Sequence, residues 1–314
     1  MTPAKRDEVI AFAPASVGNV GVGFDVLGHS MNAVGDRVRA TRTAARGVTI
    51  RGIEGVVRDL PMDPAKNTAS VAVEALLEAV DPGHGFELTI EKGIPLGSGL
   101  GGSAASAVAA VVAANALLAR PFDKLSLLKF AMRGEKVASG ALHVDNVAPS
   151  LYGGLILTVG IDDPHVTPIP VPEGVRAVLV HPHIELPTRK SREVLNRTVT
   201  LSDVVWQQAN LAGFLAGCFT RDLHLIRVSL EDVVIEPQRR DLIPGFLAVK
   251  SAALERGALG CSISGAGPSV FAWAEESTAP GIRDGMVAAF AANGLAADAW
   301  IAPIQSDGAS VVDR

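Results

Sequence analysis

Residues 93–106 read Gly93-Ile94-Pro95-Leu96-Gly97-Ser98-Gly99-Leu100-Gly101-Gly102-Ser103-Ala104-Ala105-Ser106. The segment before them, residues 86–91, alternates apolar and polar side chains, which predicts a strand with one buried face. The segment after them, residues 104–119, is rich in good helix formers and predicts a long helix. The glycine-rich stretch is therefore expected to be a loop that joins a strand to the N-terminus of a helix.

A loop of this kind is suited to bind an anion. The first N–H groups of a helix have no partner inside the helix and carry a partial positive charge. Glycines allow positive φ and a close approach of the backbone to a ligand. These two properties predict a cradle for phosphate. A tight turn without a ligand is the plainer alternative, and the density of glycine and serine argues against it.

Two common phosphate-binding motifs fit this loop less well. Gly97, Gly99 and Gly102 formally match G-x-G-x-x-G. The dinucleotide-binding fold also needs a second strand that ends in an acidic residue about 20 positions further on. Asp123 has this spacing, but a further helix is predicted there instead of a strand. A Walker A loop needs a lysine, and residues 93–106 contain none.

Length and composition restrict the class of protein. A chain of 314 residues favours two domains, and 48% hydrophobic with 19% charged residues indicates a globular protein. The net charge of -5 argues against a nucleic-acid partner. Two cysteines cannot form a disulfide framework, no secretory signal is visible, and residues 104–119 are too weakly apolar to span a bilayer. We therefore expect a cytoplasmic protein that binds neither nucleic acid nor membrane.

The loop resembles the second signature of the GHMP kinase superfamily, in which it wraps the triphosphate of ATP. This resemblance implies ATP as a substrate, with Ser103 near the metal ion and the phosphates. Asn67 lies in a stretch that resembles the adenine-pocket segment of the family, although a helix-start polar pair is nearly as good an explanation. Gly102 stands where many members carry a serine. The implied ATP-binding residues are Pro95, Leu96, Gly97, Ser98, Gly99, Leu100, Gly101, Gly102, Ser103 and Asn67.

An acidic residue on an apolar helix face is a candidate metal ligand. Residues 124–138 predict a helix in which Leu125, Leu128, Met132 and Glu135 share one face. A buried carboxylate must be paired, hydrogen-bonded, protonated or metal-bound, unless Glu135 reaches solvent at the helix end. The resemblance implies that Glu135 binds Mg²⁺, which prefers hard oxygen ligands.

Further segments narrow the resemblance to the homoserine kinase family. Residues 143–150 read His143-Val144-Asp145-Asn146-Val147-Ala148-Pro149-Ser150, and residues 14–25 match the first family signature. Taken alone, these segments could be a structural His-Asp pair and a hairpin turn. In the family, the matching side chains contact the amino-acid substrate. The implied substrate-binding residues are Asn19, Asp25, His143, Asp145, Arg192 and Arg239.

The two arginines lie in loop-like stretches, Thr188 to Arg192 and Glu236 to Arg239, where exposed arginine is common. The resemblance implies that they hold the substrate α-carboxylate, for which a planar guanidinium is well suited. Because Arg240 follows Arg239 directly, the sequence does not decide which of these two residues is the second arginine.

The catalytic residues that the resemblance implies are Asp145, Asp25, Asn146 and Arg192. Asp145 and Asp25 are the carboxylates that could accept the hydroxyl proton. A loose transition state needs no base, however, and orientation of the hydroxyl is the alternative.

The expected fold is α+β with two domains, residues 1–163 and 164–314. The resemblance implies that the first domain binds ATP and is similar to ribosomal protein S5. In the second, strands at residues 176–180, 259–264, 269–274 and 297–302 and helices at 246–256 and 280–292 follow the order β-α-β-β-α-β of a ferredoxin-like sandwich. Residues 264–269 resemble the third family signature, which packs against the phosphate loop. A first strand is expected at residues 9–13, ending at Pro14, and the tail from Ser306 is expected to be loose.

The resemblance as a whole implies an ATP- and Mg²⁺-dependent kinase of threonine biosynthesis that converts L-homoserine to O-phospho-L-homoserine and forms a homodimer. Two alternatives remain at this stage. One is a GHMP kinase for another small alcohol such as mevalonate, and the other is a catalytically silent relative that binds nucleotide.

Overall fold

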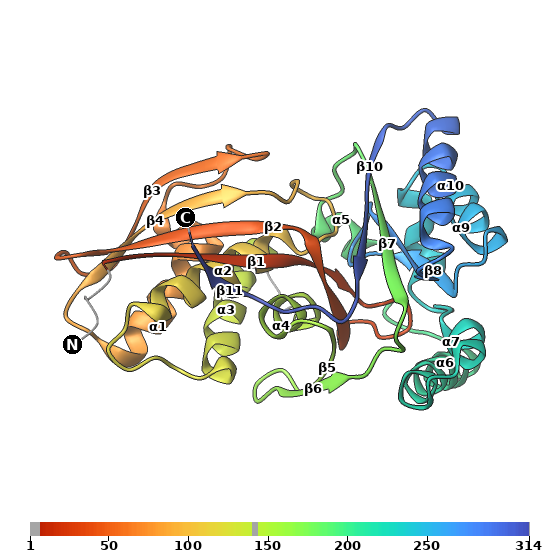
Figure 1. The fold of residues 1–314 in the computed structure, drawn as a ribbon, viewed down its shortest axis with the longest axis horizontal. Helices are drawn as coiled ribbons and strands as arrows, with labels where there is room; N and C mark the ends of the chain where they lie inside the picture. The colour runs from red at the N-terminus through yellow and green to blue at the C-terminus, as the bar shows by residue number, and fades with distance from the viewer. Residues whose placement is uncertain (1–6, 140–143, 314) are drawn as a thin grey trace.

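The computed structural model describes residues 7–139 and 144–313, and the strands of these residues form two sheets (Figure 1). The first sheet has the order β11-β1-β2-β4-β3, with β5 beside β2 and β6 beside β5. Its strands are β1 (Glu8–Gly18), β2 (Leu27–Thr43), β3 (Val48–Gly55), β4 (Gly85–Lys92), β5 (Leu155–Val159), β6 (His165–Ile169) and β11 (Ser310–Val312).

Four helices cover one face of this sheet: α1 (Thr68–Val80), α2 (Gly102–Ala116), α3 (Lys124–Ser139) and α4 (Val144–Tyr152). The central one is α2, which packs on β1 and β2 and contacts α1, α3 and α4. Its alanines are almost all buried, because short side chains let a helix lie close to a sheet and to other helices at once. The sequence-based expectation of a long helix after the loop is confirmed.

The second sheet has the order β10-β7-β9-β8 and is formed by β7 (Val175–Pro182), β8 (Gly260–Ile263), β9 (Val270–Glu275) and β10 (Ala297–Pro303). Two helices, α9 (Phe246–Glu255) and α10 (Ala279–Ala292), pack on one face of it. Together these elements run β7-α9-β8-β9-α10-β10, so the predicted ferredoxin-like order is confirmed. The helices α5 (Thr188–Glu193), α6 (Leu201–Thr220), α7 (Leu223–Ser229) and α8 (Glu236–Arg239) lie between β7 and α9.

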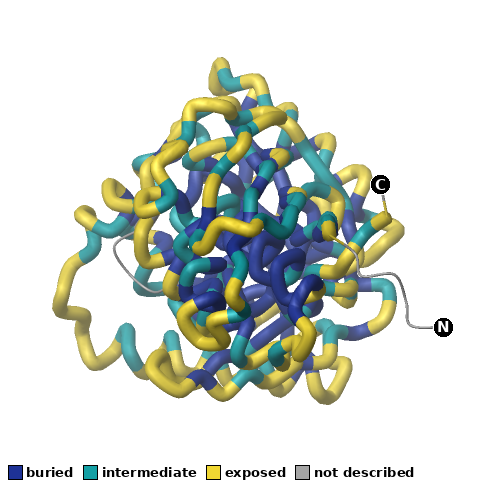
Figure 2. The backbone as a smooth tube through the Cα atoms, turned by 90° about the vertical axis from the view of Figure 1, so that its left-hand side faces the viewer, coloured by how far each residue is buried: buried dark blue, intermediate teal, exposed yellow. Residues whose placement is uncertain are grey.

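The two sheets share buried side chains through β7. Ala177 and Leu179 belong to the core of the first sheet, whereas Val178 and Val180 belong to the core under α9 and α10. Successive residues of a strand point to opposite faces, so the second sheet is buried on both sides. Figure 2 shows buried chain concentrated in the middle of the view, with exposed chain around it.

Two expectations about the first sheet were wrong. The first strand was expected to end at Pro14, but β1 continues to Gly18. A register shift falls between Pro14 and Ala15, and proline is tolerated at such an irregularity because it has no N–H to donate. The tail was expected to be loose, yet β11 pairs with β1, with Ile10 opposite Val312. This pairing satisfies backbone groups along that side of β1.

The domain division between residues 163 and 164 stays a prediction. By sheet membership, β6 belongs to the first sheet because it pairs with β5, with Leu155 opposite Ile169, so a boundary drawn from the sheets falls after Ile169.

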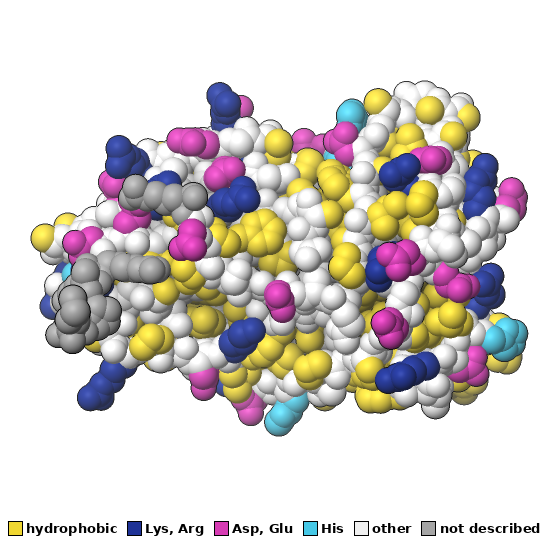
Figure 3. All heavy atoms as spheres, viewed as in Figure 1, with side chains coloured by type: hydrophobic (Ala, Val, Ile, Leu, Met, Phe, Trp, Pro, Cys, Tyr) yellow, Lys and Arg dark blue, Asp and Glu magenta, His cyan; other side chains and the backbone are white. Residues whose placement is uncertain are grey.

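No helix of the described residues is long and apolar enough to cross a membrane. On the face in Figure 3, acidic and basic side chains are interspersed.

Candidate active site

A cavity of about 500 Å³ opens where the glycine loop meets the second half of the chain. The loop and the start of α2 form one wall, and residues of α3 and α4 form another. Residues of α5 and α8 and the turn after β8 complete it. The cavity is lined by residues including Asn19, Asp25, Asn67, Lys92, Gly97, Ser98, Gly99, Gly101, Gly102, Ser103, Glu135, Asp145, Asn146, Arg192, Arg239, Gly265 and Ala266.

The glycine loop ends at the N-terminus of α2, as predicted. Gly101 is the N-cap of α2, has a φ of 66° and makes no side-chain capping bond. The first N–H groups of α2 are thus left without a side-chain acceptor at a point where Gly101, Gly102 and Ser103 line the cavity. This geometry is the anion cradle that the sequence predicts.

The tip of the loop is held by the turn between β8 and β9. The Ser264 hydroxyl donates to the Gly99 carbonyl oxygen over 2.8 Å, and the Ser269 N–H donates to the Ser98 carbonyl oxygen over 3.2 Å. A Cβ on Gly99 would come within 2.5 Å of the Ser264 carbonyl oxygen. Residues 264–269 therefore pack against the loop, as the third family signature implied.

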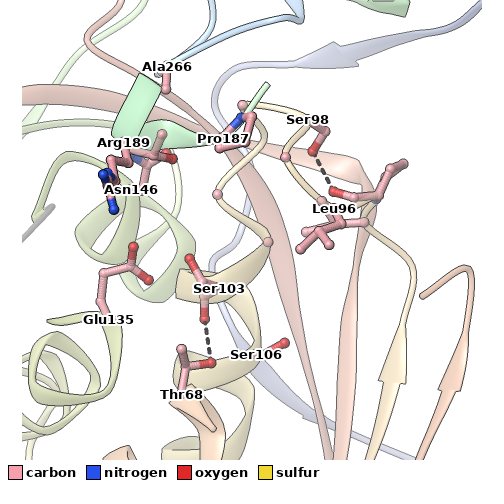
Figure 4. Close-up of a pocket in the computed structure, with 18 of the residues that line it drawn as sticks. Thr68, Leu96, Ser98, Ser103, Ser106, Glu135, Asn146, Pro187, Arg189 and Ala266 are labelled. Atoms are coloured by element: carbon pink, nitrogen blue, oxygen red, sulfur yellow. Dashed lines mark hydrogen bonds between the residues drawn. The ribbon is translucent and has the colours of Figure 1, made fainter. Parts of the chain in front are cut away.

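Glu135 faces the start of α2. Its side chain is only 4% exposed and lines the cavity, so the alternative that it escapes to solvent is wrong. Figure 4 shows Glu135 and Ser103 directed into the same space from α3 and α2. Beside them, the Thr68 hydroxyl donates to the Ser103 carbonyl oxygen over 3.4 Å.

The turn after β1 also lines the cavity, and its backbone is strained. Asn19 has a φ of 67° and Asp25 has a φ of 61°, values that residues other than glycine adopt rarely. The Asn19 side chain donates to the Gly265 carbonyl oxygen over 2.8 Å and accepts from the Asp25 N–H over 3.0 Å. The Asn19 N–H donates to Oδ2 of Asp145 over 3.2 Å. These bonds hold the turn in its strained conformation and bring Asp25 and Asp145 to one site.

Arg192 and Asp25 form a two-pronged ion pair, with N–O distances of 2.8 and 2.5 Å. The guanidinium of Arg192 also lies over the Phe24 ring, 4.9 Å from its centroid. The side chains of Arg192 and Asp25 are each about one-third exposed. The sequence predicted a loop at Arg192, but this residue lies on the short helix α5.

Arg239 is almost completely buried and lies on α8, again a helix where a loop was expected. It donates to the carbonyl oxygens of Ser191 over 3.0 Å and Gly265 over 3.1 Å. Burial, together with the positive charge of Arg192, lowers the pKa of Arg239 to about 10, which leaves it charged at neutral pH. Arg239 lines the cavity and Arg240 does not.

Most of the predicted site residues come together in this cavity. Leu100 is the exception in the loop, because its side chain is fully buried in the core and only its backbone is engaged, as the acceptor for the Ser16 N–H. Asn67 lines the cavity and caps α1. Asn146 lines it as well and accepts from the Ser16 hydroxyl over 3.0 Å. His143 lies outside the described residues.

Sequence reasoning missed Lys92, which is buried and lines the cavity. A signal for it existed, because Phe86, Leu88 and Ile90 alternate along the strand and Lys92 continues their face. Ser106, Thr68 and Lys66 also line the cavity and had not been singled out as ligands.

Comparison with known proteins agrees with this geometry. Residues 67–154 match the family model described as the GHMP kinases N terminal domain, and residues 212–292 match the GHMP kinases C terminal model. The cavity lies between these two regions, and the fold and site define a GHMP kinase.

More specific similarities point to one branch of that superfamily. The chain is 48% identical to the homoserine kinase of Xylella fastidiosa (strain M12), over 96% of this chain and 93% of that protein. It is 49% identical to that of Xanthomonas campestris pv. campestris (strain B100), over 99% and 96%. The crystal structure of homoserine kinase from Cytophaga hutchinsonii superposes with a TM-score of 0.96 at 42% identity, covering 99% of both chains. The chain belongs to the homoserine kinase family.

Proposed function

We propose that this protein transfers the γ-phosphoryl group of ATP to the side-chain hydroxyl of L-homoserine and so forms O-phospho-L-homoserine, a step of threonine biosynthesis. The observation that carries this proposal is the arrangement of one cavity. An anion cradle, a carboxylate and two arginines line the same space. Family membership over nearly the full chain supports the same activity.

Backbone N–H groups would provide most of the hydrogen bonds to the phosphates. Phosphoryl transfer requires alignment of the reactants and neutralisation of charge on the transferred group more than covalent chemistry by the protein. The amides of the loop and of the first turn of α2, with the Ser103 hydroxyl, supply such donors. We propose that Asn67, which lines the cavity at the start of α1, binds the nucleoside.

Two residues close to the glycine loop also fit a magnesium ion. Glu135 offers a carboxylate and Ser103 a hydroxyl, both hard oxygen donors of the type that Mg²⁺ takes. Within residues 7–139 and 144–313, no group of three or more His, Cys, Asp and Glu side chains could form a metal cage. This is the pattern of a site where substrate phosphates and water complete the coordination. When bound, the ion would offset phosphate charge, and Glu135 would hold it.

The charged side chains that line this cavity suit a zwitterion. The α-carboxylate of an amino acid would take donors from Arg192 and Arg239, and the α-ammonium group would take the carboxylate of Asp25 in exchange. A neutral alcohol could form neither of these two charged contacts, and a simple carboxylic acid could form only the contact with the arginines. The charged groups thus favour an amino acid over mevalonate as the acceptor.

The existing contacts of Asp25 bear on the question of a general base. Both of its carboxylate oxygens accept from Arg192, so Asp25 is better placed to position the substrate than to remove a proton. Asp145 is buried, lines the same cavity and accepts from the Asn19 N–H. We propose that Asp145 and Asn146 orient the substrate hydroxyl toward the phosphate end, a role that a loose transition state permits without full deprotonation.

The decisive test is ADP release by the purified protein with ATP and Mg²⁺. The acceptors are L-homoserine, L-serine, L-threonine and mevalonate, with a control that contains no acceptor. We expect turnover with L-homoserine far above the other four reactions. Turnover with mevalonate instead would support the kinase of another alcohol, and ATP binding without any turnover would support the silent relative.

We also propose, on the family resemblance, a homodimer in the cytoplasm. The free thiols of Cys218 and Cys261, both buried, are consistent with a reducing compartment. Sedimentation velocity of the full chain tests the dimer, and a monomer at all accessible concentrations would contradict it.

A further inference from the structure

A buried carboxylate holds both ends of the glycine loop. Asp36 lies in β2 and its side chain is fully buried. Its Oδ1 accepts from the N–H groups of Gly93 over 3.0 Å and Ile94 over 3.1 Å, where the loop begins. Its Oδ2 accepts from the Ser106 hydroxyl over 2.7 Å, in the helix that follows the loop. One side chain from a distant strand thus ties the entry of the loop to its exit.

Lys92 closes this arrangement from β4. Its Nζ contacts Oδ2 of Asp36 and donates to the Gly102 carbonyl oxygen over 2.8 Å and to the Ser106 hydroxyl over 2.9 Å. An ammonium group has three N–H donors, so all three are engaged. The Ser106 hydroxyl donates its one proton to Asp36 and accepts from Lys92. We call Asp36, Lys92 and Ser106 the loop anchor.

The loop anchor is neutral as a unit, since the ammonium of Lys92 is paired with the carboxylate of Asp36. The pairing therefore weakens the field that Lys92 exerts on a phosphate in the cavity. The attraction at this end comes mainly from the amides of the loop and of α2, and their directions depend on the backbone that the anchor holds. Lys92 would have to give up a partner in order to bind a phosphate itself.

We propose that Asp36 is a positioning residue for phosphoryl transfer, which acts through Lys92 and Ser106 to set the geometry of the phosphate cradle. The inference rests on the proposed function, in which ATP is the ligand of the loop. The competing interpretation is that Lys92 binds phosphate directly and that Asp36 only weakens its charge.

The variant Asp36→Asn separates these interpretations by the sign of its effect. Its one carbonyl oxygen can still serve Gly93 and Ile94, but its NH₂ group would face the donors Lys92 and Ser106. If Asp36 positions the loop, ATP binds more weakly. If the charge of Lys92 attracts phosphate directly, removal of the neighbouring negative charge makes ATP bind more tightly.

The experiment is calorimetric binding of a non-hydrolysable ATP analogue to the full chain, together with steady-state kinetics. For Asp36→Asn we expect affinity for the analogue to fall roughly tenfold or more and KM for ATP to rise in parallel, with KM for homoserine changed less than about twofold. The matched control is Glu91→Gln, next to Lys92 in β4, where an exposed carboxylate pairs with Arg37 over 3.4 Å. It should leave all three quantities unchanged.

The double variant Asp36→Asn/Lys92→Met removes the conflict between donors and should recover part of the lost affinity. If Asp36→Asn does not fold, Ser106→Ala tests the loop anchor by removing a neutral member of it, with an expected loss of affinity for the analogue of about three- to tenfold. Tighter or unchanged binding of the analogue, or equal rises in KM for ATP and homoserine, would overturn the proposal. Turnover of homoserine by the wild type is a separate measurement, so failure of the proposed function would be seen independently of the anchor.

Discussion

At the scale of single residues, the charged groups of the cavity are held by one another before any ligand arrives. Arg192 spans both oxygens of Asp25, and Arg239 is fixed by backbone carbonyl groups. Because rotamer freedom is already lost, less entropy remains to be lost when a substrate binds. The cavity is preorganised for a small molecule that carries both signs of charge.

The first prediction concerns Arg192→Ala. Loss of a charged hydrogen bond to the substrate carboxylate should raise KM for homoserine roughly ten- to a hundredfold, with a smaller change in kcat. Lys190→Ala is the control, because Lys190 is exposed on the same helix and does not line the cavity. Steady-state kinetics measure both, and an unchanged KM in Arg192→Ala would mean that this arginine has only a surface role.

A second prediction separates the two carboxylates. Asp145→Asn keeps the shape of the side chain but alters its hydrogen bonding beside the substrate hydroxyl, so kcat should fall at least about tenfold. Asp25→Asn removes the partner of the substrate ammonium group and of Arg192, so KM for homoserine should rise instead. An Asp145→Asn variant with the kcat of the wild type would remove Asp145 from the mechanism.

At the scale of elements, the glycine loop depends on parts of the chain that are far away in sequence. Its two ends are tied to β2 through Asp36, and its tip is tied to the turn after β8 through Ser264. The left-handed backbone at Gly99 allows this close contact with the second half of the chain. The loop is therefore a joint product of both halves.

The third prediction tests that contact with Gly99→Ala. A Cβ there would lie 2.5 Å from the Ser264 carbonyl oxygen and 2.6 Å from that of Gly267, and the φ of 76° adds strain. We expect a loss of about 2–4 kcal/mol in the free energy of unfolding and at least a tenfold loss of activity. Chemical denaturation and the ADP assay measure these effects.

Gly294→Ala is the matched control for Gly99→Ala. Its φ is 77°, but a Cβ there would meet no atom within 4 Å. It should therefore cost only about 1–2 kcal/mol and leave activity intact. Equal losses in the two variants would show that backbone strain alone, and not the contact with the turn, is responsible.

At the scale of the whole molecule, the two halves meet across a buried aromatic cluster. His29 of β2 lies between Phe271 and Trp273 of β9, with ring centroids 6.2 and 6.0 Å apart, and Phe214 of α6 packs on Trp273 at 5.0 Å. Burial lowers the pKa of His29 from 6.5 to about 4. The junction of the halves thus contains a neutral histidine that resists protonation.

The fourth prediction is a dependence of stability on pH. Because the pKa of His29 is lower in the folded than in the unfolded protein, its contribution to stability is complete above about pH 6.5 and is lost as the pH falls toward 4. At about 1.4 kcal/mol per pH unit, the full loss is about 3 kcal/mol. Denaturation at pH 5 to 7 measures the slope.

His29→Phe should give a shallower slope over the same range of pH. His181, whose pKa burial also lowers to about 4, is present in both proteins and contributes equally to each slope. Identical slopes for the wild type and His29→Phe would contradict the assignment to His29.

Prediction from the sequence succeeded where the signal is local. The glycine loop, α2, α3 and the elements of the second sheet have turn residues, caps and periodicities within a few positions of each other, and these govern local structure directly. It failed for β1 beyond Pro14 and for β11, since both depend on a partner strand elsewhere in the chain. Short helices such as α5 are also decided by packing more than by propensity.

Contiguous motifs of the sequence already specify the chemical groups with which this protein binds phosphate and an amino acid. The pairing of these groups depends on the tertiary structure. Arg192 and Asp25 are 167 positions apart, and Asp36 and Ser106 are 70 apart. No local pattern encodes such partners, since a charge pairs with whatever the folded chain brings within hydrogen-bond distance.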